Sequence, residues 1–207
     1  GDTVIAELTY APAARIWRIN KGWRRRKDKK QLGFYINPLS GVWSKQESAD
    51  EDNSDDSDDD NLLGKVAKQR IVPFVEDHRN ILIMTPKQEL PVETMATLQA
   101  ALKRGIEQTF QVEESELVVE ALPSGDNRRA LLFYEAAEGG AGVLTRIASE
   151  PATLAEVARQ ALRVMHFDVP YEAILSVEAL GQVEIKKEGQ RICEAGCYQC
   201  LLSYFNQ

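Results

Sequence analysis

The residues best suited to chemistry are three cysteines near the end of the chain, Cys193, Cys197 and Cys200. Cys197 and Cys200 are three residues apart at the expected start of a helix, so both thiolates can turn toward one ion, and Cys193 can approach from the preceding turn. Structural zinc takes four nitrogen or sulfur ligands in a tetrahedron. The spacing predicts a zinc site whose fourth ligand is His166, His78 or a residue beyond Gln207.

Two other interpretations of the cysteines stay open. Reduced cysteines can pack as small apolar residues, and a CxxC pair can carry out redox chemistry. The cysteines lie close together in a chain that has no others, which argues against a secreted disulfide scaffold and favours a reducing, cytoplasmic setting.

A glycine-rich turn is the second candidate site. It follows an apolar run, Ala130–Tyr134, and precedes a helix expected from about Val143; its glycines are Gly139, Gly140 and Gly142. Backbone amides at a helix N-terminus favour an anion, so this is a candidate phosphate-binding turn. The turn matches neither a P-loop nor a dinucleotide fingerprint, so no ATP site is expected. The alternative is a tight turn that lets the helix pack closely on the sheet.

Glu135 and Glu138 lie at the same strand end and form a candidate carboxylate pair for a metal or for acid–base work. No histidine or aspartate joins them in the sequence, so a solvated or turn-capping role is favoured. We therefore predict no catalytic residue, and keep a metal-dependent nuclease as a minor alternative.

The third candidate site is a basic segment that contains two tryptophans. Cationic side chains can neutralise phosphates while indole rings stack on unpaired bases. The alternative is an edge hairpin whose positive charge deters strand pairing. On an uninterrupted strand both tryptophans would share a face, although Gly22 can break that alternation. The candidate nucleic-acid-binding residues are Arg15, Trp17, Arg18, Lys21, Trp23, Arg24, Arg25, Arg26 and Lys27.

Charge is segregated along the chain. The net charge is −7, yet segment 15–30 has nine basic residues and one acidic residue, while segment 47–60 has nine acidic residues and no basic one. The acidic segment lacks the apolar residues that would offset its ordering entropy, so 46–62 is predicted to be a disordered linker or loop. No apolar run is long enough to cross a membrane.

The strand-like and helical segments that must position these residues predict an α/β fold. We predict a mixed sheet flanked by helices, with a β-hairpin-like N-terminal arm and a C-terminal cysteine-rich helix. Apolar residues recur at helical spacing over Pro91–Phe110, and Pro151 starts a further helix. The predicted divisions are a basic arm over 1–45, the acidic segment 46–62 and an α/β domain over 63–207, all expected to be part of a larger protein.

Two segments together resemble a known family. Leu132–Gly142 and Cys197–Gln207 resemble the MrfA-type zinc-binding domain that ends many bacterial superfamily 2 DEAD/DEAH-box helicases, and the resemblance covers about Val72–Gln207. It implies that Cys193, Cys197 and Cys200 hold structural zinc in a module of a 3′-to-5′ DNA translocase. A common family form has a further cysteine where Arg191 stands, and other members continue after Gln207 with a histidine.

The basic first third is similar to DISARM phage-defence proteins, both the DrmA helicase and its partner DrmB. The resulting expectation is a non-catalytic zinc-binding accessory domain that helps an ATP-dependent helicase engage single-stranded or forked DNA, in DNA repair or antiviral defence. A protein-docking module, in which zinc is purely structural, is the alternative.

Overall fold

In the computed structural model, the described residues are 4–25, 28, 30–44, 68–123, 126–137, 139–167, 196–198 and 200–202. The chain divides into two compact units. Unit 1 comprises Gly1–Ala14 and His78–Gln207, and unit 2 comprises Arg15–Asp77. The predicted acidic segment 46–62 lies outside the described residues.

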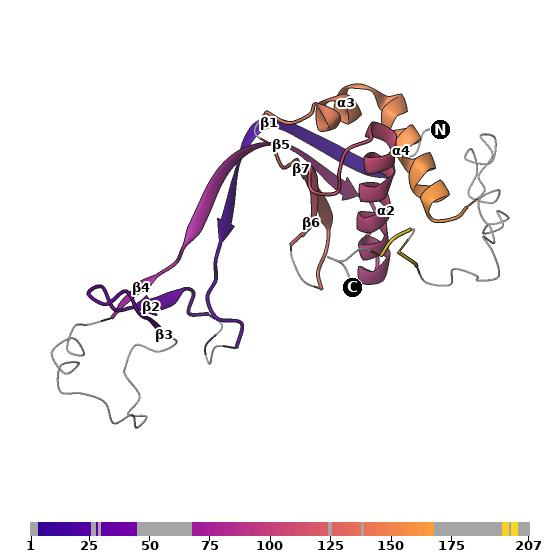
Figure 1. Cartoon of the computed structure of the whole chain (residues 1–207). Helices are drawn as coiled ribbons and strands as arrows, with labels where there is room; N and C mark the ends of the chain where they lie inside the picture. Colours follow the sequence, from indigo (N-terminus) through magenta and orange to yellow (C-terminus); the bar gives the residue numbers. More distant parts are fainter. Residues whose placement is uncertain are drawn as a thin grey trace. The chain divides into compact units, whose positions relative to one another are not determined.

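A four-stranded sheet in the order β1-β5-β7-β6 forms one layer (Figure 1). The strands are β1 (Ala6–Ile19), β5 (Phe74–Pro86), β6 (Leu117–Leu122) and β7 (Ala130–Glu135). Strand β7 pairs antiparallel with both β5 and β6, with Tyr134 opposite Ile81 and Val118. The predicted apolar run is therefore an inner strand, in which Leu131, Phe133 and Tyr134 are buried.

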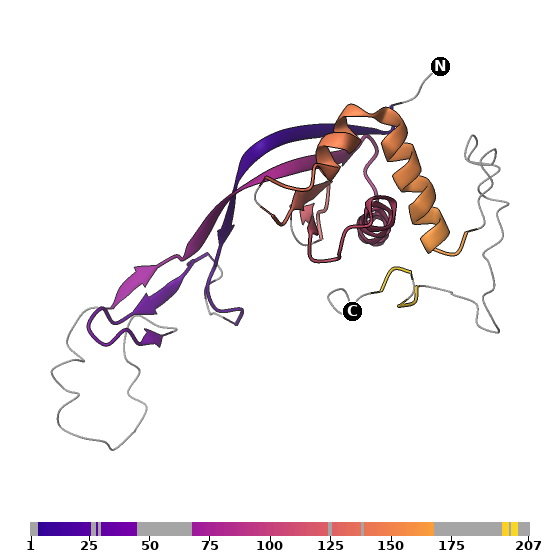
Figure 2. The ribbon, with the colours of Figure 1, turned by 45° about the horizontal axis from the view of Figure 1, so that its top comes forward.

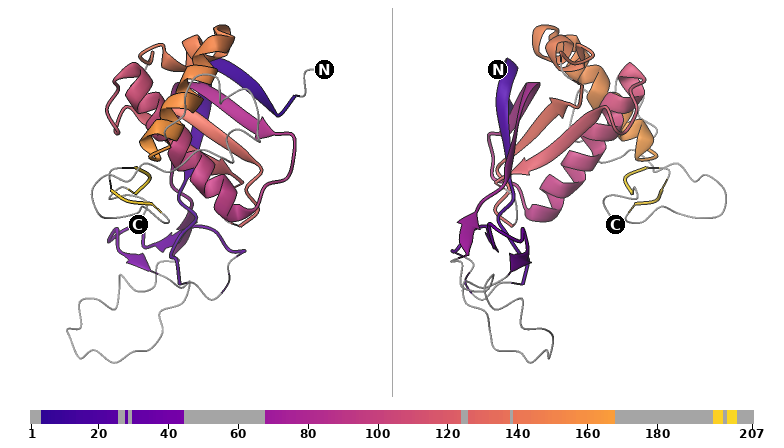
Figure 3. Two further views of the ribbon diagram at one scale, coloured as in Figure 1. Left: turned by 90° about the vertical axis from the view of Figure 1, so that its right-hand side faces the viewer. Right: turned by 60° about the vertical axis from the view of Figure 1, so that its left-hand side comes forward.

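Three helices cover the sheet on one side, α2 (Val92–Phe110), α3 (Val143–Ser149) and α4 (Pro151–Val164) (Figures 1 and 3). The predicted face of α2 enters the core through Met95, Leu102 and Ile106, because these residues recur at steps of three to four along the helix. Leu98 and Phe110 of the same face are partly buried against that core. The predicted α/β architecture is confirmed.

Helices α2 and α4 pack closely at Gly105. A Cβ atom on Gly105 would lie 2.5 Å from the carbonyl oxygen of Val157 and 3.0 Å from the Cβ of Ala161. Val157 and Ala161 are themselves buried on α4. The close approach places the end of α4, which precedes His166, in the same helical layer as α2 (Figure 2).

Unit 2 contains a three-stranded antiparallel sheet in the order β3-β2-β4, formed by Trp43–Ser44, Phe34–Ile36 and Gln69–Ile71. A turn follows β2, in which Asn37 Oδ1 accepts from the backbone N–H of Leu39 at 2.9 Å and Gly41 adopts φ +72°. Gly22 and Gly33 form an isolated bridge with φ of +105° and +93°. An added Cβ at either would overlap the facing backbone, so both positions require glycine.

Strand β1 is continuous through Ala13, which adopts φ +48°. One local prediction differs from the structure. In place of a helix, the described residues of the cysteine-rich segment form turns, with the N–H groups of Cys200 and Leu202 both donating to the carbonyl of Cys197. No helix among the described residues is long and apolar enough to cross a membrane.

Candidate metal centre

Three potential metal ligands converge within unit 1. The ligand atoms of His166, Cys197 and Cys200 all lie within 4.8 Å of one another. Nε2 of His166 is 3.3 Å from Sγ of Cys197, which is 3.5 Å from Sγ of Cys200. A sulfur–sulfur separation of this size excludes a disulfide, whose bond length is about 2.05 Å.

Two of the three separations are close to those expected around a tetrahedrally coordinated zinc ion, and the third, between His166 and Cys200, is within 4.8 Å. Zn–S bonds of about 2.3 Å and a Zn–N bond of about 2.0–2.1 Å give tetrahedral edges of about 3.8 Å between two sulfurs and about 3.6 Å between sulfur and nitrogen. The measured edges of 3.5 and 3.3 Å are close to these values. Imidazole nitrogen and thiolate sulfur are also the donors that zinc prefers, so geometry and chemistry agree.

The turn that carries Cys197 and Cys200, here called the cysteine turn, is partly buried and is held by hydrogen bonds. Cys200 is 2% exposed and its Sγ accepts from the backbone N–H of Cys197 at 3.0 Å. A hydrogen bond from a backbone amide stabilises a thiolate. The turn is also connected to α2, because the guanidinium of Arg104 donates to the carbonyl of Leu202 at 3.4 Å.

Of the chain's two histidines, the structure brings one to the cysteines. His166 follows the C-cap of α4, whereas His78 is an exposed residue of β5 and is not part of the group. Cys193 lies outside the described residues, and its role as a ligand stays a prediction.

The glycine-rich turn encloses a carboxylate. Glu135 is 3% exposed, and its two oxygens accept from the backbone N–H of Val143 at 2.8 Å and from Nδ2 of Asn80 at 3.2 Å. A Cβ atom on Gly140 would overlap this carboxylate. The amide that begins α3 thus has a partner within the chain. Phosphate binding by Gly139, Gly140 and Gly142 stays a prediction, and Glu138 lies outside the described residues.

The candidate nucleic-acid-binding segment is largely exposed. Lys21, Arg24 and Arg25 have exposed side chains, while Arg15 pairs with the carboxylate of Glu76 at 3.3 Å. Arg26 and Lys27 lie outside the described residues.

Both tryptophans of the candidate nucleic-acid-binding segment contact other aromatic rings. Trp17, which is 54% exposed, packs on Phe74 with ring centroids 5.6 Å apart. Trp23 meets Phe34 edge-on at 5.4 Å, and Phe34 meets Trp43 at 5.1 Å. The two tryptophans of the basic segment therefore join separate aromatic contacts. Phe34, Trp43 and Phe74 are not predicted by the sequence as part of this site, because no local spacing connects them to the basic residues.

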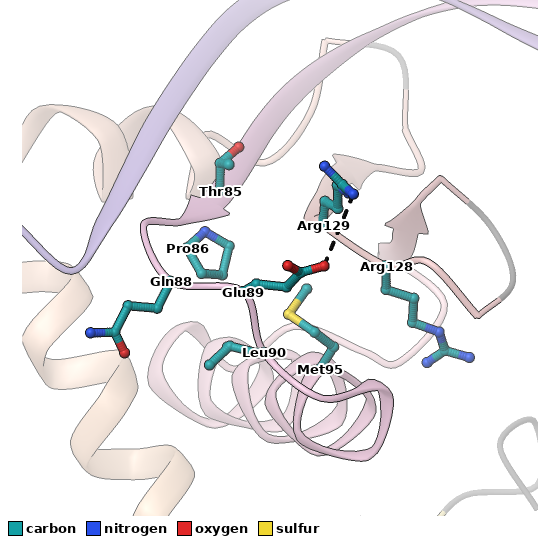
Figure 4. Close-up of a pocket in the computed structure, with 8 residues that line it drawn as sticks. All are labelled: Thr85, Pro86, Gln88, Glu89, Leu90, Met95, Arg128 and Arg129. Atoms are coloured by element: carbon teal, nitrogen blue, oxygen red, sulfur yellow. Dashed lines mark ion pairs between the residues drawn. The ribbon is translucent and has the colours of Figure 1, made fainter.

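A pocket of about 240 Å³ lies between the end of β5, the start of α2 and the residues before β7 (Figure 4). Glu89 and Arg129 form a long ion pair of 4.0 Å at its edge, and their side chains are 81% and 66% exposed. Since both charges are solvated, the pocket offers no built ligand site. It is lined by Thr85, Pro86, Gln88, Glu89, Leu90, Met95, Arg128 and Arg129.

Comparison with known proteins points to the cysteine turn. A family model described as the MrfA Zn-binding domain matches residues 98–201, a range that includes all three cysteines and His166 and excludes the basic segment. No curated protein matches the chain. Among solved structures, the chain is similar to the crystal structure of the DUF1998 helicase MrfA bound to DNA, with a TM-score of 0.44 and 10% identity. The match covers 99% of this chain and 24% of that one.

Proposed function

Because this chain belongs to the family of MrfA Zn-binding domains, we propose that it is a non-catalytic, zinc-binding accessory module of a superfamily 2 DNA helicase. The ATP-dependent motor lies elsewhere in the parent protein or in a partner subunit. Cys193, Cys197 and Cys200 supply thiolates to a structural zinc ion. We place the module in the cytoplasm, where thiols are kept reduced.

The observation that carries this proposal is the convergence of His166, Cys197 and Cys200 inside the matched range. Zinc, when bound, supplies a cross-link between segments that are distant in the sequence, and no chemistry on a substrate. The free energy of zinc binding then stabilises the folded chain, since the ligands are brought together only in that state.

Metal analysis tests this part directly. The reduced chain should contain about one zinc ion, and removal of zinc by a chelator should lower its melting temperature. A reduced, folded chain that holds no zinc would contradict the proposal.

We further propose that the basic segment contacts DNA, with a preference for single-stranded or forked substrates. Lys21, Arg24 and Arg25 are exposed, and Trp17 and Trp23 present rings beside them in the sequence. Phosphate neutralisation and base stacking are the two interactions that sequence-independent single-strand binding uses. The pathway that we propose is either DNA repair or phage defence, the second suggested by the similarity of the basic first third to DISARM proteins.

A docking module is the second candidate, favoured by the exposed apolar side chains of unit 2, among them Trp43 (48%) and Phe74 (58%). The salt dependence of DNA affinity distinguishes DNA binding by the basic segment from a protein-docking role. Replacing Arg24, Arg25 and Arg26 with alanine should reduce the slope of log K against log salt by about two to three, at 0.7–0.9 per phosphate contact. An Arg128→Ala, Arg129→Ala variant removes charge elsewhere and is the control. An unchanged slope would favour docking.

A nuclease receives less support. The carboxylate of Glu135 is buried and hydrogen-bonded within the chain, which leaves it poorly placed to meet a substrate or a hydrated cation.

A further inference from the structure

We infer that His166 is a zinc ligand of this chain, binding through Nε2 beside the thiolates of Cys197 and Cys200. This inference rests on the proposed zinc function and adds a nitrogen ligand that the cysteine pattern by itself does not supply. It assigns a role to one of only two histidines in the chain.

The backbone at His166 supports this assignment. Helix α4 ends at Val164 with Met165 as its C-cap, and His166 follows with φ +70°. The N–H of His166 donates to the carbonyl of Arg163, and the N–H of Phe167 donates to the carbonyl of Leu162. These two bonds define a Schellman motif, in which the residue after the C-cap adopts the left-handed conformation.

Glycine is the residue usually found at that position, because it has no Cβ to clash with the backbone. Histidine there costs free energy that glycine would avoid. A residue that is unfavourable for the backbone is explained when its side chain has a task, and here the imidazole points at a thiol 3.3 Å away.

Both halves of the site are anchored to the same helix. The end of α4 carries His166, and α4 packs on α2 through Gly105. The cysteine turn is held to the same helix α2 by the hydrogen bond between Arg104 and Leu202. Because both halves are attached to α2, His166 meets Cys197 across 31 positions of sequence.

The second sulfur distinguishes a metal site from a simple imidazole–thiol pair. A pair requires one cysteine, whereas here a second sulfur lies 3.5 Å from the first and is buried. Two adjacent thiolates repel each other, and a divalent cation between them removes that repulsion. With Nε2 on the metal, the ring proton resides on Nδ1.

Two variants test the inference in the 207-residue chain. His166→Gly places the favoured residue at the end of α4, so the variant should fold without metal at least as well as the parent. It should nevertheless bind zinc at least about tenfold more weakly in competition with a chelator, because changes even in groups around metal ligands cost 10–100-fold. His78→Ala, at the exposed histidine, should bind zinc with unchanged affinity.

A spectroscopic measurement identifies the histidine that binds zinc directly. In the parent chain labelled with ¹⁵N-histidine, added zinc should shift the ring nitrogens of one histidine and fix its proton on Nδ1. The affected signal should persist in His78→Ala. In His166→Cys, X-ray absorption should show tight zinc binding with one more sulfur neighbour than in the parent.

The outcomes are distinguishable. If the parent binds zinc while neither histidine signal responds, or if His166→Gly keeps the parent's affinity, the inference is wrong and zinc binding itself stands. If the parent binds no zinc at all, the proposed function fails together with it. A response from His78 alone would also overturn the inference.

Discussion

The buried carboxylate of Glu135, the last residue of β7, accepts a hydrogen bond from the backbone N–H of Val143, the first residue of α3, at 2.8 Å. Removing the carboxylate would leave this amide without its acceptor. The Nδ2 group of Asn80 would lose one of its two acceptors and keep the carbonyl of Gly139 at 3.1 Å. The carboxylate therefore performs a structural task in the glycine-rich turn, where the sequence favours a turn-capping role.

We expect Glu135→Ala to lower the free energy of unfolding by about 1–3 kcal/mol, the cost of a buried polar group that loses its partner. Urea denaturation provides the measurement. Glu89→Ala is the control, because the Glu89 side chain is 81% exposed. Equal stability of the two variants would show that the carboxylate does not cap α3.

Gly140→Ala should destabilise the chain more than Gly139→Ala. Both glycines have positive φ, at +66° and +82°, so both variants strain the backbone. Only at Gly140 would the new Cβ overlap the Glu135 carboxylate, while at Gly139 it would meet nothing within 4 Å. The difference in the free energy of unfolding should be about 1–3 kcal/mol. Identical losses would contradict the packing of this turn.

Phosphate binding at the same turn is testable by mass action. A phosphate that binds only the folded chain would raise the melting temperature with concentration. Such a ligand would compete with Glu135 for the amide of Val143, so the effect should grow in Glu135→Ala. If neither phosphate nor sulfate raises the melting temperature of the parent chain or of Glu135→Ala, the turn is not an anion-binding site.

Gly105→Ala has two opposing effects on stability, a gain in helix propensity and a loss from overpacking between α2 and α4. Alanine is favoured over glycine within a helix by about 1 kcal/mol. The new methyl group would press on Val157 and Ala161, and overpacking costs about 1–3 kcal/mol. We expect a net loss of stability in thermal denaturation. Adding Ala161→Gly should recover part of it, and a stabilised single variant would show that α2 and α4 separate easily.

Trp23→Ala should weaken binding of single-stranded DNA by about 1–3 kcal/mol if a base stacks on the ring. The charge of the chain is unchanged, so the salt slope should equal that of the parent. Trp17→Ala probes the other aromatic contact, that with Phe74. Fluorescence anisotropy with a labelled oligonucleotide measures both variants, and unchanged affinity in both would leave the tryptophans without a stacking role.

Deleting 47–61 should leave the melting temperature nearly unchanged, because this segment has almost no apolar residues with which to pack. DNA binding should tighten if the acidic residues compete with phosphates for the basic segment. A large loss of stability would show instead that the segment packs on the rest of the chain.

Several features could be predicted from the sequence because their signal is local. Apolar residues at three- and four-residue steps identified α2, a continuous apolar run identified the inner strand β7, and Pro151 marked the start of α4. The spacing of Cys193, Cys197 and Cys200 pointed to zinc for the same reason, since neighbouring ligands can be recognised without knowing the fold.

The tertiary structure alone decided which distant residues meet. The sequence left His166 and His78 equal as zinc ligands, and only the packing of α4 on α2 brings His166 to Cys197. It likewise did not reveal that Phe74 packs on Trp17. Helical and strand periodicity report only which face of an element is buried, whereas partners across 31 or more positions are chosen by how those faces pack.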